Sequence, residues 1–177
     1  MKKITAMLLS LVLITGAFAG CAPSEPEPTA TPEPELTAAE RAELYKTAIE
    51  NARGEEENTN MPVATDPEAE EMSMLLEMLG ITAEDTDGFA LSVSMMNVRA
   101  YGIAVIKPAE GSEEAVKTGL ENFITTQQQN FEFYLADQYE IAKAAKLETL
   151  EDGTVVMVMC ENADEVYTSI TDAITAK

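Results

Sequence analysis

The sequence predicts an α+β domain in which a mainly antiparallel sheet of about four strands, arranged as two hairpins, packs against helices. Segments with helical spacing of apolar residues and segments with strand-like alternation follow one another in the order ααββααββα. Each pair of neighbouring strands is joined by a connection short enough for a hairpin, which favours antiparallel pairing. This single domain is expected to span residues 37–177.

The first helix is expected where Thr37 and Glu40 have the spacing of a capping box and Gly54 provides a stop. Residues 55–65 are expected to form a loop. The apolar positions of this helix recur at helical spacing and form a modest stripe: Ala38, Ala42, Tyr45, Ala48, Ile49 and Ala52.

The second helix is expected to begin with Asp66 as its cap and Pro67 in its first position, and to end at Gly80. These signals mark both ends of a segment whose apolar residues again follow helical spacing. The residues predicted to face the core are Met72, Leu75, Leu76 and Leu79.

Two strands are expected next, over residues 89–96 and 100–107, and the three residues between them suggest a hairpin. The second strand is apolar on both faces. In the first strand, Ser92 and Ser94 mark one face, and the other face is apolar, with Leu91, Val93 and Met95.

The next segments are expected to be helical again. Ser112 is expected to cap a long helix that runs through about Tyr134, and residues 135–145 are expected to form a shorter helix after a bend. The predicted buried side of the long helix consists of Val116, Leu120, Phe123, Ile124, Phe131 and Tyr134.

Residues 146–160 carry the clearest hairpin signal, with Asp152 and Gly153 at the turn. Asn162 with Glu165 is then expected to cap a final helix. Its core-facing residues are predicted to be Val166, Ile170 and Ile174.

The amino-terminal residues predict where the protein is located in the cell rather than how it folds. Lys2 and Lys3 precede an apolar run over residues 4–17 that is too short to span a membrane. The following residues, Phe18-Ala19-Gly20-Cys21, resemble the lipobox of bacterial lipoproteins. Residues 1–20 are therefore expected to be a lipoprotein signal peptide, with lipid such as palmitate attached to Cys21. The alternative is a plain signal peptide cut elsewhere, which leaves Cys21 as a free thiol.

Residues 21–36 alternate proline with glutamate, and this composition predicts an extended, solvated spacer behind the lipidated cysteine. The chain has 11 basic and 32 acidic residues, for a net charge of −21. This charge disfavours nucleic-acid binding, which needs basic patches for phosphate, and leaves the lipid as the expected membrane contact.

The residues that carry chemistry point to no recognisable catalytic site. Because the chain has no histidine, it has no Ser-His-Asp triad, Cys-His dyad or histidine-bearing zinc site. Cys160 ends an apolar run and is expected to be a small buried hydrophobe. No cofactor or metal is expected, and a carboxylate pair stays the alternative route to an enzyme.

Three further features have two interpretations each. Asp85-Thr86-Asp87-Gly88 partly matches a calcium loop but lacks its remaining ligands, so a polar turn is expected. Gln127 lies within an apolar stripe, where it could contact a ligand but is expected to bond to backbone. Four aromatic residues at the helix bend are expected to close the end of the core, although they could line a partner groove: Phe131, Phe133, Tyr134 and Tyr139.

Two long segments carry a family resemblance: SVSMMNVRAYGIAVIKPAEGSEEAV, from residue 92, and QQQNFEFYLADQYEIAKAAKLETLEDGTVVMVMCENADEV, from residue 127. With the lipobox, they resemble a family of short lipoproteins from Gram-positive bacteria that is defined by a domain of unknown function. The resemblance implies an extracytoplasmic, membrane-anchored protein and supplies no activity or site residues.

We therefore expect a lipid-anchored protein at the extracytoplasmic side of the cell membrane. Its expected role is a non-enzymatic binding or interaction module that meets an envelope protein or small ligand through its sheet or its aromatic bend. The alternative is a carboxylate-based envelope hydrolase with an unrecognised site.

Overall fold

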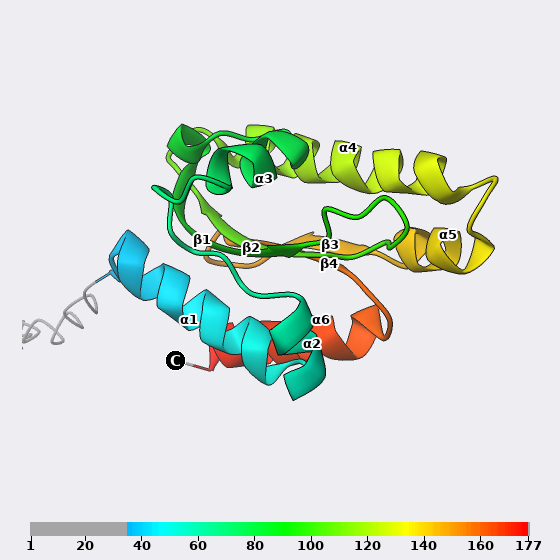
Figure 1. The fold of residues 1–177 in the computed structure, drawn as a ribbon. Helices are drawn as coiled ribbons and strands as arrows, with labels where there is room; N and C mark the ends of the chain where they lie inside the picture. The colour runs from blue at the N-terminus through cyan, green and yellow to red at the C-terminus, as the bar shows by residue number, and fades with distance from the viewer. Residues whose placement is uncertain (1–34, 177) are drawn as a thin grey trace, which may run out of the picture. The chain divides into compact units, whose positions relative to one another are not determined.

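A computed structural model describes residues 35–176, which fold around a four-stranded antiparallel sheet with the strand order β1-β2-β4-β3 (Figure 1). The strands are β1 (Thr86–Val93), β2 (Gly102–Pro108), β3 (Lys146–Thr149) and β4 (Val155–Met159). β1 pairs with β2 and β3 with β4, while β2 and β4 join the two hairpins. The predicted α+β class with two hairpins is confirmed.

Helices cover both faces of the sheet (Figure 1). One face carries α3, α4 and α5, and the other carries α1 and α6. The helix bounds are α1 (Ala38–Asn51), α2 (Glu55–Asn60), α3 (Met72–Met78), α4 (Glu113–Phe131), α5 (Ala136–Lys143) and α6 (Ala163–Thr175), with a 3₁₀ turn η1 (Ala83–Asp85) before β1.

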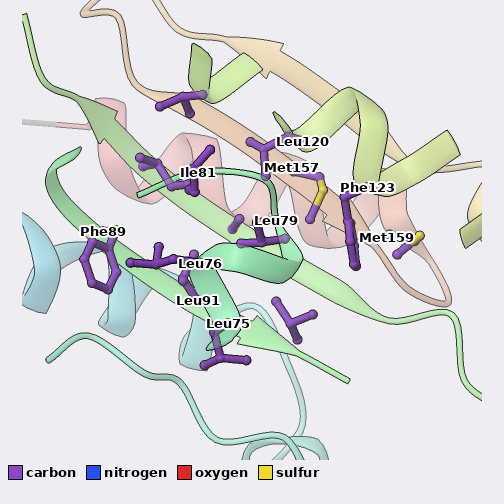
Figure 2. Packing of buried hydrophobic residues seen from close by; sticks show 14 of the residues in the cluster. Leu75, Leu76, Leu79, Ile81, Phe89, Leu91, Leu120, Phe123, Met157 and Met159 are labelled. Atoms are coloured by element: carbon purple, nitrogen blue, oxygen red, sulfur yellow. The ribbon is translucent and has the colours of Figure 1, made fainter. Parts of the chain in front are cut away.

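The alternation of side chains along the central strands creates two apolar cores. On β2, Ala104 and Ile106 join the core under α3 and α4, whereas Ile103 and Val105 join the core under α1 and α6. All four are fully buried, as expected for a strand that is apolar on both faces. Figure 2 shows the first core, where residues of α3 and α4 such as Leu120 meet the β strands. Neither face of the central strands is open to a partner.

Several local predictions hold. Thr37 and Glu40 form the predicted capping box, with the Thr37 hydroxyl accepting from the Glu40 backbone N–H at 3.3 Å. The 146–160 hairpin has its turn at Gly153, whose φ of +84° favours glycine. The predicted core residues of α6 are buried: Val166, Ile170 and Ile174.

Residues 55–65 are not wholly a loop, because residues 55–60 form the short helix α2. No residue of α2 is buried, so an apolar pattern could not predict it. Its start carries three glutamates at the positive end of the helix, a favourable placement.

The helix predicted to begin at Asp66 is α3, which begins later, at Met72. Asp66 instead opens a turn, in which its side chain accepts from the Glu68 N–H at 2.9 Å.

Ser112 and Asn162 stand at the predicted N-cap positions of α4 and α6, but neither side chain makes a capping hydrogen bond. The Ser112 hydroxyl donates to Asp85 Oδ1 at 3.1 Å and makes no capping bond to α4. Asn162 does precede α6, but it adopts a left-handed conformation with φ +58° and makes no side-chain cap. Asparagine tolerates this conformation better than most residues.

Gly88 permits a close approach between β1 and α1. The pairing of β1 with β2 is irregular between Thr86 and Phe89, and Gly88 lies there with φ +100°. A Cβ at this position would lie 2.8 Å from the carbonyl oxygen of Ala38. We expect Gly88→Ala to lower the free energy of unfolding by about 2 kcal/mol, measured by urea denaturation.

Gly111→Ala is the matched control for that variant. Gly111 also has a positive φ, +85°, but no atom lies within 4 Å of the position that an added methyl group would take. It should therefore cost about 1 kcal/mol from backbone strain alone. Equal losses in the two variants would contradict a steric role for Gly88.

The signal peptide (residues 1–20), Cys21 and the spacer up to residue 34 lie outside the described residues. Within residues 35–176, no helix is both long enough and apolar enough to cross a membrane.

Candidate functional site

An open cleft of about 930 Å³ lies where the end of α1, α2, the β1–β2 connection, α5 and the start of α6 come together. We call it the Arg53 cleft and define it by the polar and charged residues used below: Arg53, Glu57, Arg99, Tyr101, Glu161 and Asn162. Figure 1 shows the end of α1 and the start of α6 at the same end of the domain. Its volume is within the range of small-molecule sites.

Arg53 is held in place by hydrogen bonds to three elements of the fold. Its Nε and Nη2 donate to Asn58 Oδ1 of α2 at 3.0 and 2.7 Å. Its Nη1 donates to Ser92 Oγ of β1 at 2.8 Å and to the Tyr101 hydroxyl at 2.5 Å. A guanidinium fixed in this way is pre-organised, because its orientation is set before any ligand arrives.

Arg99 contacts the ring of the same tyrosine, whose hydroxyl accepts from Arg53. Its guanidinium carbon is 5.1 Å from the centroid of the Tyr101 ring, within the distance of a cation–π contact. Tyr101 is only 2% exposed, and this burial raises the pKa of its hydroxyl to about 12, against the opposing effect of Arg53. Two arginines therefore share one buried tyrosine.

Cys160 follows directly after β4. It is buried, as predicted, and burial raises the pKa of its thiol to about 12. Glu57 and Glu161 raise this pKa further, whereas Arg53 and Arg99 oppose them. The charges of two acidic and two basic residues thus act on the Cys160 thiol, and its raised pKa is the opposite of what a nucleophilic cysteine needs.

We expect Cys160 to be unreactive in the folded protein. In the Cys21→Ala variant it is the sole thiol, so a thiol reagent at pH 8 should modify the native chain slowly and the urea-unfolded chain at once. Rapid stoichiometric modification of the native chain would contradict its burial.

The pKa of the Cys160 thiol is higher in the folded than in the unfolded state, so the free energy of unfolding should fall as pH rises from about 9 toward 12.

The carboxylates of Asp85 and Asp87 are bonded to other residues of the protein. Asp85 Oδ2 accepts from the Thr82 backbone N–H at 2.8 Å and from its hydroxyl at 2.7 Å, which lowers the pKa of Asp85. Asp87 pairs with Arg41 at 2.6 Å. Among residues 35–176, no group of three or more acidic, histidine or cysteine side chains is placed to hold a metal ion. The expected polar turn is only partly present, because Asp85 ends the 3₁₀ turn η1 whereas Thr86, Asp87 and Gly88 already belong to β1.

The aromatic residues at the bend between α4 and α5 were expected to close the end of the core, and two of them do not. Phe131 is buried, but Phe133 and Tyr134 are 80% and 86% exposed, so these two do not close the core. The backbone contact expected of Gln127 is made by its neighbour Gln128, whose Nε2 donates to the Ala142 carbonyl at 3.2 Å.

Sequence reasoning missed Arg53 and the residues that hold it in place. Arg53 stands next to the predicted stop Gly54, Asn58 lies in the predicted loop, and Ser92 lies on the predicted polar face of a strand. Ser92 was the one residue that could have indicated these contacts. It is buried in a strand that is covered on both faces, and a buried hydroxyl needs a polar partner.

A family model described as "Domain of unknown function (DUF4358)" matches residues 63–160, which is more than half of the chain. The match includes all four strands and, from the cleft, Arg99 and Tyr101. No curated protein and no solved structure matches the chain.

Proposed function

The chain belongs to the family defined by the domain of unknown function DUF4358, and on that premise we propose that it is a non-enzymatic binding module, held at the extracytoplasmic side of the cell membrane by lipid on Cys21. The observation that carries the binding role is the Arg53 cleft, which combines a volume of about 930 Å³ with a guanidinium fixed by four hydrogen bonds. Fixed polar groups in a concave surface are typical of ligand sites.

The anchor rests on the order of basic start, short apolar run and lipobox-like residues before Cys21. Two acyl chains on one cysteine would anchor the chain stably, at about 0.8 kcal/mol for each buried methylene. Cells fed labelled palmitate should label the wild type and Cys160→Ala, but not Cys21→Ala. An unlabelled wild type would remove the anchor from the proposal.

The placement of the cleft suits a tethered module. Figure 1 shows the first described residues entering α1 at the end of the domain opposite the end of α1 that borders the cleft. A chain anchored through its amino-terminal segment would attach to the domain at the far end of α1. In this proposal an envelope protein or a small ligand binds at the end of the domain opposite this attachment point.

The alternative, a carboxylate-based hydrolase, has weaker support. Such an enzyme pairs two acids and raises the pKa of the one that donates a proton. Glu57 and Glu161 both line the cleft, but Glu161 is exposed. The carboxyl pKa shifts within residues 35–176 are those of Asp85 and Asp137, and both are lowered by hydrogen bonds.

Photo-crosslinking in intact cells tests the binding role. A photoreactive residue replaces Ser169, an exposed residue of α6 that lines the cleft, or Lys117, an exposed residue of α4 on the other side of the sheet. The Ser169 position should capture the same species reproducibly, and Arg99→Gln should abolish that capture. No reproducible product from Ser169, or the same products from Lys117, would overturn the binding role.

A further inference from the structure

The arginines of the cleft have no acidic ion-pair partner among residues 35–176. The ion pairs formed by residues 35–176 are Arg41–Asp87, Lys143–Glu140 and Lys146–Asp164, none of which includes Arg53 or Arg99. A chain with 32 acidic residues offers many possible partners. Two guanidiniums that nevertheless share one tyrosine without a carboxylate form a local site for an anion.

The remaining donors indicate which anion fits. Arg53 has five N–H groups and uses four of them on Asn58, Ser92 and Tyr101, so one on Nη2 has no acceptor within the described part of the chain. The Arg99 guanidinium makes no hydrogen bond to protein among residues 35–176, and its planar fork can hold a carboxylate with two parallel bonds. Together they can offer three donors to one planar carboxylate.

The surrounding charge limits the ligand further. Four glutamates also line the cleft, namely Glu56, Glu57, Glu161 and Glu165. They would repel a doubly charged group such as phosphate, because like charges at close range destabilise each other. They would attract an ammonium group. Glu57 and Glu161 line the same cleft as Arg53 and Arg99, and the charges of all four act on the Cys160 thiol.

We propose that the Arg53 cleft binds a zwitterionic ligand of the amino-acid or short-peptide class. The ligand's carboxylate bonds to Arg99 and to Nη2 of Arg53, and its ammonium group lies against Glu57 and Glu161. The cleft volume of about 930 Å³ leaves room for more than one residue of such a ligand. This inference rests on the proposed function, because it names the ligand of the same cleft.

Calorimetric titration of the full chain with tri-alanine tests the assignment. Tri-alanine carries both charges, N-acetyl-tri-alanine lacks the ammonium group, and tri-alanine amide lacks the carboxylate. We expect saturable binding of tri-alanine and at least tenfold weaker binding of both blocked forms. Equal binding of the three peptides, or no binding of tri-alanine, would overturn the zwitterion assignment.

Arg99→Gln is the diagnostic variant, since its guanidinium makes no hydrogen bond within the described part of the chain that the fold would lose. It should weaken tri-alanine binding at least tenfold, whereas Lys117→Gln, which removes one positive charge from α4, should leave binding unchanged. Unchanged binding by Arg99→Gln would reject the site. Capture from Ser169 without tri-alanine binding would reject the ligand class and leave the proposed function standing. If neither crosslinking from Ser169 nor tri-alanine binding is observed, both the ligand class and the proposed function are rejected.

Discussion

Gly119→Ala should lower the free energy of unfolding by about 3 kcal/mol, although alanine is the better helix former by about 1 kcal/mol. Gly119 lies in α4, where this helix crosses the end of α3. A Cβ there would lie 2.6 Å from the Leu79 carbonyl oxygen, 2.8 Å from Ile81 Cγ2 and 3.0 Å from the Gly80 carbonyl oxygen. Two of these three atoms belong to the backbone, so relief requires the helices to separate.

Urea denaturation followed by circular dichroism measures this loss. Gly54→Ala is the control, because Gly54 has an ordinary negative φ and no atom within 4 Å of the added methyl group. We expect Gly54→Ala to change the free energy of unfolding by less than about 1 kcal/mol. A Gly119→Ala protein as stable as the wild type would show that α3 and α4 do not approach as closely as described.

Arg53→Met should also cost about 3 kcal/mol, because it removes four hydrogen bonds from a charged donor and leaves part-buried acceptors unpaired. The helix α2 should be affected most. It has no buried residues, and Asn58 joins it to the domain by accepting from Arg53 and donating to the Glu50 carbonyl at 2.8 Å.

Amide hydrogen exchange of α2 and urea denaturation together test this role of Arg53. Arg99→Met makes the same substitution at the other arginine that contacts Tyr101. It should cost less than about 1 kcal/mol, because among residues 35–176 the Arg99 guanidinium makes a cation–π contact but no hydrogen bond or ion pair. In Arg53→Met, the amides of residues 55–60 should exchange faster, while those of β4 follow the global loss of stability. Unchanged exchange in α2 would show that Arg53 does not hold this helix.

Much of the fold follows from the spacing of apolar residues. The strands β2 and β4 are apolar on both faces, and the helices α1, α4 and α6 carry apolar stripes that the two cores bury. Side-chain caps were harder to predict, because Ser112 finds a better partner in Asp85 from a different element. A residue's long-range partners are not visible in its local sequence.

The same reason explains why the cleft was not predicted. Arg53 meets Ser92 and Tyr101, which lie 39 and 48 positions further along the chain. Nothing near Arg53 in the sequence indicates these contacts, and α2 could not be expected from a segment without apolar spacing. Cys160, by contrast, was correctly predicted to be buried, because its surroundings are apolar in the sequence itself.

Methyl NMR of the full chain, labelled on its methionines, tests most directly whether the Arg53 cleft is the binding site. Met96 lines the cleft and Met74 lies exposed on α3, on the other side of the sheet; both are about half exposed, so their methyl signals respond to nearby ligands. On titration with tri-alanine, the Met96 signal should shift and saturate while the Met74 signal stays fixed, and Arg99→Gln should suppress the shift. A saturating shift at Met74 with none at Met96, or no shift at either, would contradict the account.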